Sequence, residues 1–242
     1  MSQIYAHRGF SGKYPENTML AFEKAVEMGC DGIETDVQMT SDGELVLIHD
    51  EWLERTTNGA GWVHQHTLAE LKALDANKLF AGTYPAQQMP TLREYFEYMQ
   101  DKPLITNLEL KTGLDVYPGI EKAVIDMARE YNMLDKISIS SFNHYTIVRC
   151  RELAPQVNYG LLVNCWIVDV GAYAKKLGAN TVNAEFRACL HREVVDEMHR
   201  NGIGAVVYTP NEVEDMKKLV ENGVDILISN FPDRGMKVLG RA

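Results

Sequence analysis

Short segments with β-strand character alternate with longer helical patterns along most of the 242-residue chain. This alternation constrains the fold most, because strand–helix–strand repeats form a parallel sheet with helices packed outside it. Eight strand-like segments in a chain of this length predict an α/β fold, a (β/α)8 barrel. An open, doubly wound sheet is the alternative, because periodicity does not close a sheet. The expected strands are 3–7, 32–37, 104–110, 136–140, 157–163, 180–184, 204–208 and 225–229, and the expected helices are 17–28, 91–101, 117–131, 143–153, 190–201 and 212–222.

No linker or low-complexity tract interrupts the alternation, so we expect one domain over residues 1–242. Residues 51–90 are the main departure, with one short helical pattern in otherwise irregular chain. A connection this long inside a compact domain is usually functional. We interpret it as a small insertion after the second strand. In a barrel it would lie over the C-terminal ends of the strands, where barrel active sites are found.

The second departure is a hairpin expected between residues 33 and 50, with its turn at Ser41-Asp42-Gly43. If Met39 pairs with Glu44 across this turn, the return arm places His49 near Glu34. The hairpin would therefore bring a histidine onto a carboxylate by local geometry alone.

The formal net charge of −10 argues against nucleic acid or an anionic membrane surface as the main partner. No stretch approaches the roughly 20 apolar residues of a membrane span, and the N-terminus lacks an apolar run of signal-peptide length. We therefore expect a cytoplasmic protein without stable membrane insertion; homo-oligomer formation stays open. The cysteines show no metal or redox spacing, and we interpret them as buried apolar residues: Cys30, Cys150, Cys165 and Cys189.

Two neighbouring strands carry acids on one face. In "GIETDV", Glu34 and Asp36 share a face, while the residues between them and beside them point to the other side. In "ITNLELK", Asn107, Glu109 and Lys111 share a face in the same way. The apolar faces should meet the helices, which turns the polar sets into the barrel. Buried acids are costly unless they are paired or bound to metal, so this pattern predicts a site.

His7 and Arg8 end the first strand at the same level of the barrel. Three carboxylates contribute −3 and the side chains of Arg8 and Lys111 contribute +2, so the mouth would repel an anion. One divalent cation changes the sum to +1, which suits a phosphodiester monoanion. All-oxygen ligation favours Mg²⁺ or Ca²⁺ over zinc. His7 and His49 on either side could act as base and acid near neutral pH.

These residues carry a resemblance to the glycerophosphodiester phosphodiesterase family, which covers essentially the whole chain. The ordered motifs are "HRGFSGKYPENT", "GIETDVQMTSDGELVLIHD", "LERTTNGAGWVHQHTLAELKALDA", "MPTLREYFEYM", "NLELK" and "SSFN", followed more loosely by "VVYTPN" and "GVDILISNFPD". The resemblance implies a barrel that hydrolyses glycerophosphodiesters to glycerol 3-phosphate and an alcohol. The residues it implies are Glu34, Asp36 and Glu109 for one divalent metal, His7 and His49 as the acid–base pair, and Arg8 and Lys111 on the phosphate.

The chain departs from the family pattern at two places. Tyr208 and Pro210 stand where the family usually has tryptophan and valine, and Asn230 replaces the usual aspartate. We expect neither departure to touch the metal or the histidines, so both would act on the pocket wall and on substrate choice. Further candidates for supporting or lining the site are Glu16, Asn17, Asn143, Phe142, Trp166 and Tyr208.

Two other functions remain alternatives at this point. A magnesium-dependent barrel lyase or isomerase acting on a phosphorylated small molecule would need a base aimed at carbon, not two histidines beside a phosphate. A non-catalytic barrel that serves as a binding module would be expected to lack a carboxylate or a histidine, and the set is complete here.

Overall fold

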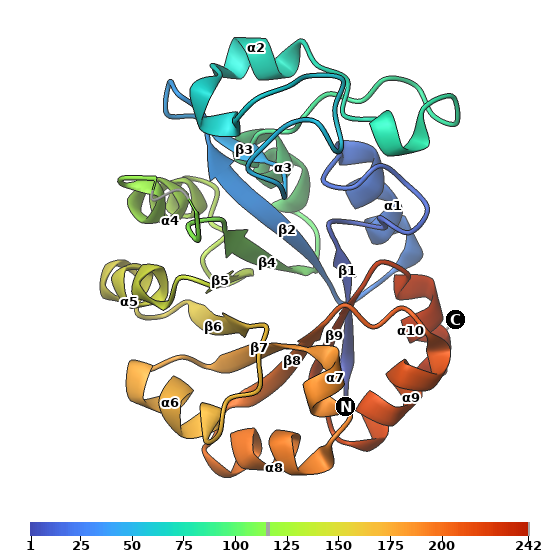
Figure 1. Cartoon of the computed structure of the whole chain (residues 1–242), viewed down its shortest axis with the longest axis vertical. Helices are drawn as coiled ribbons and strands as arrows, with labels where there is room; N and C mark the ends of the chain where they lie inside the picture. Colours follow the sequence, from blue (N-terminus) through green and yellow to red (C-terminus); the bar gives the residue numbers. More distant parts are fainter. Residues whose placement is uncertain (115–116, 242) are drawn as a thin grey trace.

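The computed structural model describes residues 1–114 and 117–241, and its parallel strands close into an eight-stranded barrel (Figure 1). β1 (Gln3–His7) pairs with both β2 (Gly32–Met39) and β9 (Ile226–Ser229), so the sheet returns to its starting strand. This closure confirms the predicted barrel and excludes the open sheet. The other parallel strands are β4 (Ile105–Leu110), β5 (Ile137–Ser141), β6 (Asn158–Val163), β7 (Thr181–Glu185) and β8 (Gly204–Tyr208).

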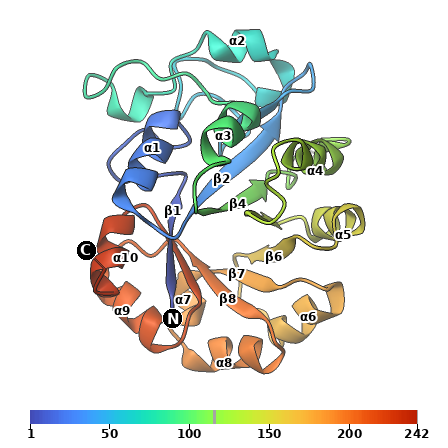
Figure 2. The ribbon, with the colours of Figure 1, turned by 180° about the vertical axis from the view of Figure 1, so that it is seen from behind.

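Helices follow the strands and surround the barrel, as both views show (Figures 1 and 2). The six predicted helices are present with slightly shorter bounds, and α6, α7 and α10 complete the ring. The bounds are α1 (Met19–Met28), α3 (Leu92–Met99), α4 (Ile120–Glu130), α5 (His144–Leu153), α6 (Val170–Leu177), α7 (Phe186–Cys189), α8 (Arg192–Arg200), α9 (Val213–Glu221) and α10 (Pro232–Val238). None of the helices in the described ranges is long and apolar enough to cross a bilayer.

Side-chain alternation along β2 separates core from site as expected. Ile33 and Val37 are fully buried in the large apolar cluster between sheet and helices. Glu34 and Asp36 take the opposite face and point into the barrel, which follows from the period of two along a strand. Tyr5, Val206 and Ile228 form a smaller apolar cluster with their neighbours, separate from the large one.

The hairpin forms at the predicted turn, but its register differs by one residue from the expected one. Met39 pairs with Leu45 of β3 (Leu45–Leu47), not with Glu44. The loop has three residues instead of four, because Thr40 and Glu44 already form the last backbone pair and Gly43 adopts a left-handed φ of +88°. Continued pairing would place His49 opposite Thr35, so the position of His49 needs another cause.

Residues 51–90 form a layer beside β2, β3 and α1 (Figure 1). The layer contains α2 (Leu68–Lys72) and two short 3-10 turns, Val63–Gln65 and Lys78–Phe80. A separate apolar cluster stabilises it and joins it to the hairpin: Val46, Ile48, Leu53, Val63, Leu71 and Met89. The insertion therefore has its own small core, attached through β3.

Gly9 is required where the chain leaves β1. Its φ is +76°, and a Cβ at this position would lie 2.7 Å from the backbone carbon of Ala21 in α1. Gly9→Ala should cost about 1 kcal/mol for the left-handed backbone and about 1–3 kcal/mol more for overpacking. The matched control is Gly82→Ala, because Gly82 has a φ of +81° but no atom within 4 Å of such a Cβ. Equal losses in denaturant-derived unfolding free energy would show that contact with α1 does not matter.

Candidate functional site

Three carboxylates lie together at the C-terminal ends of β2 and β4. In the parallel register Asp36 is the direct neighbour of Glu109, and Glu34 precedes Asp36 by one inward position. One carboxylate oxygen from each of the three residues lies within 4.8 Å of the other two. The residues are only 4%, 1% and 8% exposed for Glu34, Asp36 and Glu109, so water cannot screen their charges effectively.

Burial and mutual repulsion distribute charge unevenly over this cluster. Burial raises the pKa of Glu34 well above its usual range, and the neighbouring carboxylates raise it further. Burial also raises the pKa of Glu109. Burial alone would raise the pKa of Asp36 too, but the charges of His49 and Arg8 outweigh it and hold that pKa below its usual range. Two of the three carboxyls thus resist ionisation in the absence of a compensating cation.

Asp36 is held from one side and left open on the other. Asn17 donates from Nδ2 to Asp36 Oδ2 at 2.9 Å, and its own Oδ1 accepts from the Thr35 hydroxyl at 2.8 Å. Asp36 Oδ1 is buried and accepts no hydrogen bond. A buried carboxylate oxygen without a donor is the environment that a metal ion satisfies. The donor set therefore fits a hard divalent cation on these three carboxylates.

Two basic side chains flank the cluster. Arg8 donates from Nη1 to Glu16 at 2.7 Å, while its Nε lies 3.5 Å from Asp36 Oδ2 and makes no hydrogen bond. Lys111 donates to Glu109 Oε1 at 2.9 Å. Both cations are therefore close to the acids, and each retains donor capacity beyond these contacts.

His7 contacts a residue that the sequence analysis expected to act only on the pocket wall. Its Nδ1 lies 2.6 Å from Asn230 Oδ1, and its Nε2 lies 3.8 Å from Glu34 Oε2. The expectation that the departure at Asn230 leaves the histidines untouched was therefore wrong. Residues 7 and 230 meet because β1 and β9 are paired across the closure of the barrel. Burial, together with the charge of Arg8, lowers the pKa of His7 to about 3.

Cross-strand bonding reaches Ile48, whose N–H donates to Asp36 O at 3.2 Å, and Gln38 then holds the backbone around His49. The side-chain nitrogen of Gln38 lies within 3.0 Å of the carbonyl oxygens of Ile48, His49 and Asp50. These contacts satisfy the backbone where the chain leaves β3. The His49 ring is then fixed by its neighbour, since Nδ1 lies 2.6 Å from Asp50 Oδ1. A buried glutamine on an inward strand position was the available signal for this arrangement.

Five of the seven residues predicted for chemistry line one cavity of about 290 Å³, and Asp36 and Lys111 lie outside its lining. Its lining combines polar side chains with Leu162, Ile228 and two aromatic residues. Phe142 meets Tyr208 edge-on at 6.1 Å between ring centroids. The hydroxyl of Tyr208 donates to the Val163 carbonyl, which fixes the ring at the wall. The lining residues from the predicted set are His7, Arg8, Glu34, His49, Glu109, Phe142 and Tyr208.

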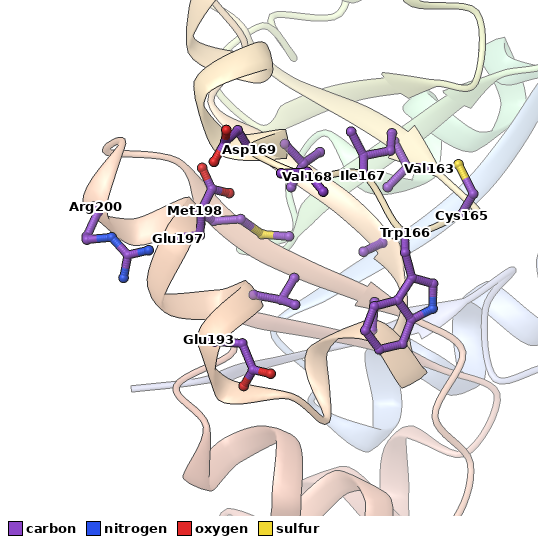
Figure 3. Close-up of a pocket in the computed structure, with 14 residues that line it drawn as sticks. Val163, Cys165, Trp166, Ile167, Val168, Asp169, Glu193, Glu197, Met198 and Arg200 are labelled. Atoms are coloured by element: carbon purple, nitrogen blue, oxygen red, sulfur yellow. The ribbon is translucent and has the colours of Figure 1, made fainter.

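Three other candidates have different surroundings. Glu16 bridges Arg8 and Arg55 behind the cavity. Asn143 caps α5 and donates to the Thr112 carbonyl, and it is not among the residues that line the cavity. Trp166 lines a separate cavity of about 370 Å³ between the loop after β6 and α8 (Figure 3). The structure therefore does not bring Trp166 to the carboxylates.

Comparison with known proteins agrees with this geometry. A family model described as the Glycerophosphoryl diester phosphodiesterase family matches residues 7–234. The chain belongs to this family. A glycerophosphodiester phosphodiesterase from Caldanaerobacter subterraneus subsp. tengcongensis is 42% identical over 230 residues, which cover 95% of this chain and 94% of the relative.

Solved structures give the same result. One, a glycerophosphodiester phosphodiesterase from Agrobacterium tumefaciens, is 27% identical with a TM-score of 0.85, covering 98% of this chain and 100% of that chain. Another, a phosphodiesterase from Oleispira antarctica in complex with the product sn-glycerol-3-phosphate, is 28% identical with a TM-score of 0.88. That match covers 99% of this chain and 97% of the other. The chain is thus an enzyme, a phosphoric diester hydrolase.

The contact between His7 and Asn230 gives a direct test of ring orientation. Asn230→Ala removes the acceptor at Nδ1, and a misplaced ring should lower kcat for glycerophosphocholine by about 10²-fold. Asn230→Asp keeps an acceptor and should retain most activity. Its added negative charge stabilises the imidazolium and raises the pKa of His7, so the limb of the pH–rate profile that reports His7 should move to higher pH. Similar losses in both variants would contradict an orienting role.

Proposed function

We propose that the chain hydrolyses glycerophosphodiesters to glycerol 3-phosphate and an alcohol, with a divalent cation bound by Glu34, Asp36 and Glu109. The observation that carries the proposal is the donor-free Oδ1 of Asp36 inside a buried carboxylate cluster that faces the same cavity as two histidines. When bound, Mg²⁺ or Ca²⁺ would neutralise this cluster and act as a Lewis acid on a phosphoryl oxygen. The sn-glycerol-3-phosphate in the structure from Oleispira antarctica supports the same product class.

The chain's own residues supply the remaining chemistry. The Arg8 Nε, which has no hydrogen-bond acceptor, and the Lys111 ammonium, 3.9 Å from Asp36 Oδ1, are the proposed donors to non-bridging phosphate oxygens. His7 and His49 each engage Nδ1 with a neighbouring oxygen, which leaves Nε2 as the ring nitrogen for proton transfer. One histidine removes a proton from the attacking hydroxyl, and the other donates one to the leaving alkoxide. Phe142 and Tyr208 form the wall against the alcohol or glycerol portion.

A metal ion held only by the native site should stabilise the fold by mass action. We expect the melting temperature of chelator-treated protein to rise on addition of Mg²⁺ or Ca²⁺. Glu109→Gln should lose this rise together with activity, since one anionic ligand is gone. Lys111→Met should keep the rise but lose activity, because its proposed contact is the phosphate. Full turnover in excess chelator would contradict the proposed metal.

Each histidine should contribute about 10²–10⁴ to the rate as an acid or a base. His7→Ala and His49→Ala should each lower kcat by that range, and the double variant should lose less than the product of the two. A nitrophenyl phosphodiester has an acidic leaving group that needs little protonation. One single variant should therefore recover much of its rate on that substrate, whereas the other should not. Equal recovery in both would be inconsistent with separate acid and base roles.

A further inference from the structure

A continuous network of alternating charge connects the phosphate-binding side of the site to His49. Arg8 donates to Glu16 Oε1 at 2.7 Å. Arg55 binds both oxygens of Glu16, from Nη2 to Oε1 at 2.7 Å and from Nη1 to Oε2 at 2.8 Å. The same guanidinium binds Asp50, from Nε to Oδ2 at 2.5 Å and from Nη2 to Oδ1 at 3.0 Å. Asp50 Oδ1 then lies 2.6 Å from Nδ1 of His49.

The geometry leaves little freedom at the centre of this network. Arg55 makes two hydrogen bonds to each of two carboxylates, and the planar guanidinium fixes their relative orientation. Burial tends to raise the pKa of Asp50, but hydrogen bonds from His49 and Arg55 bring it well below its usual range. Asp50 is therefore a carboxylate at neutral pH, and it accepts a hydrogen bond from the N–H at Nδ1 of the His49 ring.

We propose that Asp50 and Arg55 are positioning residues: Asp50 holds His49 in the tautomer that presents Nε2 to the cavity, and Arg55 fixes Asp50 and, through Glu16, Arg8. The inference rests on the proposed acid–base role of His49. It gives the inserted segment a function, because Arg55 belongs to residues 51–90 while the other members do not. Docking of the insertion would set the geometry of the acid–base and phosphate-binding groups together.

The folding of the insertion does not depend on this arginine. Its apolar core consists of side chains such as Leu53, Val63 and Leu71, all fully buried, whereas the side chain of Arg55 is 35% exposed. Loss of Arg55 should therefore leave the segment folded. The defect should be seen in turnover, because a small displacement of a catalytic ring is costly.

A double-mutant cycle separates positioning from a general structural effect. Asp50→Ala should lower kcat for glycerophosphocholine by about 10–100-fold, the usual cost of losing an orienting partner. In a His49→Ala background the same substitution should have almost no further effect, since there is no ring to orient. A loss of similar size in both backgrounds would overturn the proposal. If Asp50→Ala does not fold, Asp50→Asn keeps the shape and one acceptor oxygen and serves in the same cycle.

Arg55 is tested by comparing it with a salt bridge elsewhere. Arg55→Met should lower kcat and also raise KM, because Arg8 loses its support through Glu16. Arg241→Met is the matched control, since Arg241 makes a similarly buried two-bond contact with Asp31 away from the cavity. The control should leave both kinetic constants near those of the parent protein. A control variant that is as impaired as Arg55→Met would contradict the assignment.

A readout independent of turnover completes the design. Nitrogen-15 NMR of ring-labelled histidine reports the tautomer, and Asp50→Ala should shift the His49 signals while leaving those of His199 unchanged. Unchanged His49 signals would overturn the role of Asp50. If His49→Ala keeps full activity, the proposed acid–base function fails, whereas normal kinetics in Asp50→Ala with an inactive His49→Ala defeat only the positioning inference.

Discussion

Uncompensated negative charge inside the barrel is the constraint on which the rest of the site depends. Burying Glu34, Asp36 and Glu109 together is expensive. Lys111 and Arg8 offset part of this cost by ion pairing, and Asn17 offsets part by hydrogen bonding. The raised pKa of Glu34 shows that these partners are insufficient. A cluster of this kind is a poor structural element and a good binding site for a cation.

The alternation of strands and helices and the members of the cluster could be predicted from the sequence because both depend on periodicity, whereas the closure of the sheet rests on the pairing of β1 with β2 and β9. Alternation along β2 and β4 decides which side chains point inward, and this decision does not need the rest of the structure. The helices α6 and α10 were harder to predict. α10 begins at Pro232 and contains Gly235, and α6 starts after an irregular loop and contains Gly171, and a glycine inside a helix weakens the helical pattern.

The features that could not be predicted depend on loop geometry or on distant pairing. A single-residue change in loop length altered the register of the hairpin, and a count along the strand cannot detect that. The contact of Asn230 with His7 exists because the ends of the barrel meet. Trp166 lies in the loop after β6 and lines the cavity beside α8. Its position at the end of a predicted strand did not indicate in which direction this loop runs.

The two halves of the chain contribute different groups of residues to the site. The carboxylates, the two basic groups and both histidines come from the first 111 residues, whereas Phe142, Leu162, Tyr208 and Ile228 come from later strands and their loops. Under the proposed function, the reaction centre and the surface that meets the rest of the substrate are thus encoded separately, with Asn230 as the exception. Selectivity for the alcohol portion would then be able to diverge in the C-terminal half while the N-terminal half retains the proposed chemistry, so head-group preference would change by mutation without rebuilding the reaction centre.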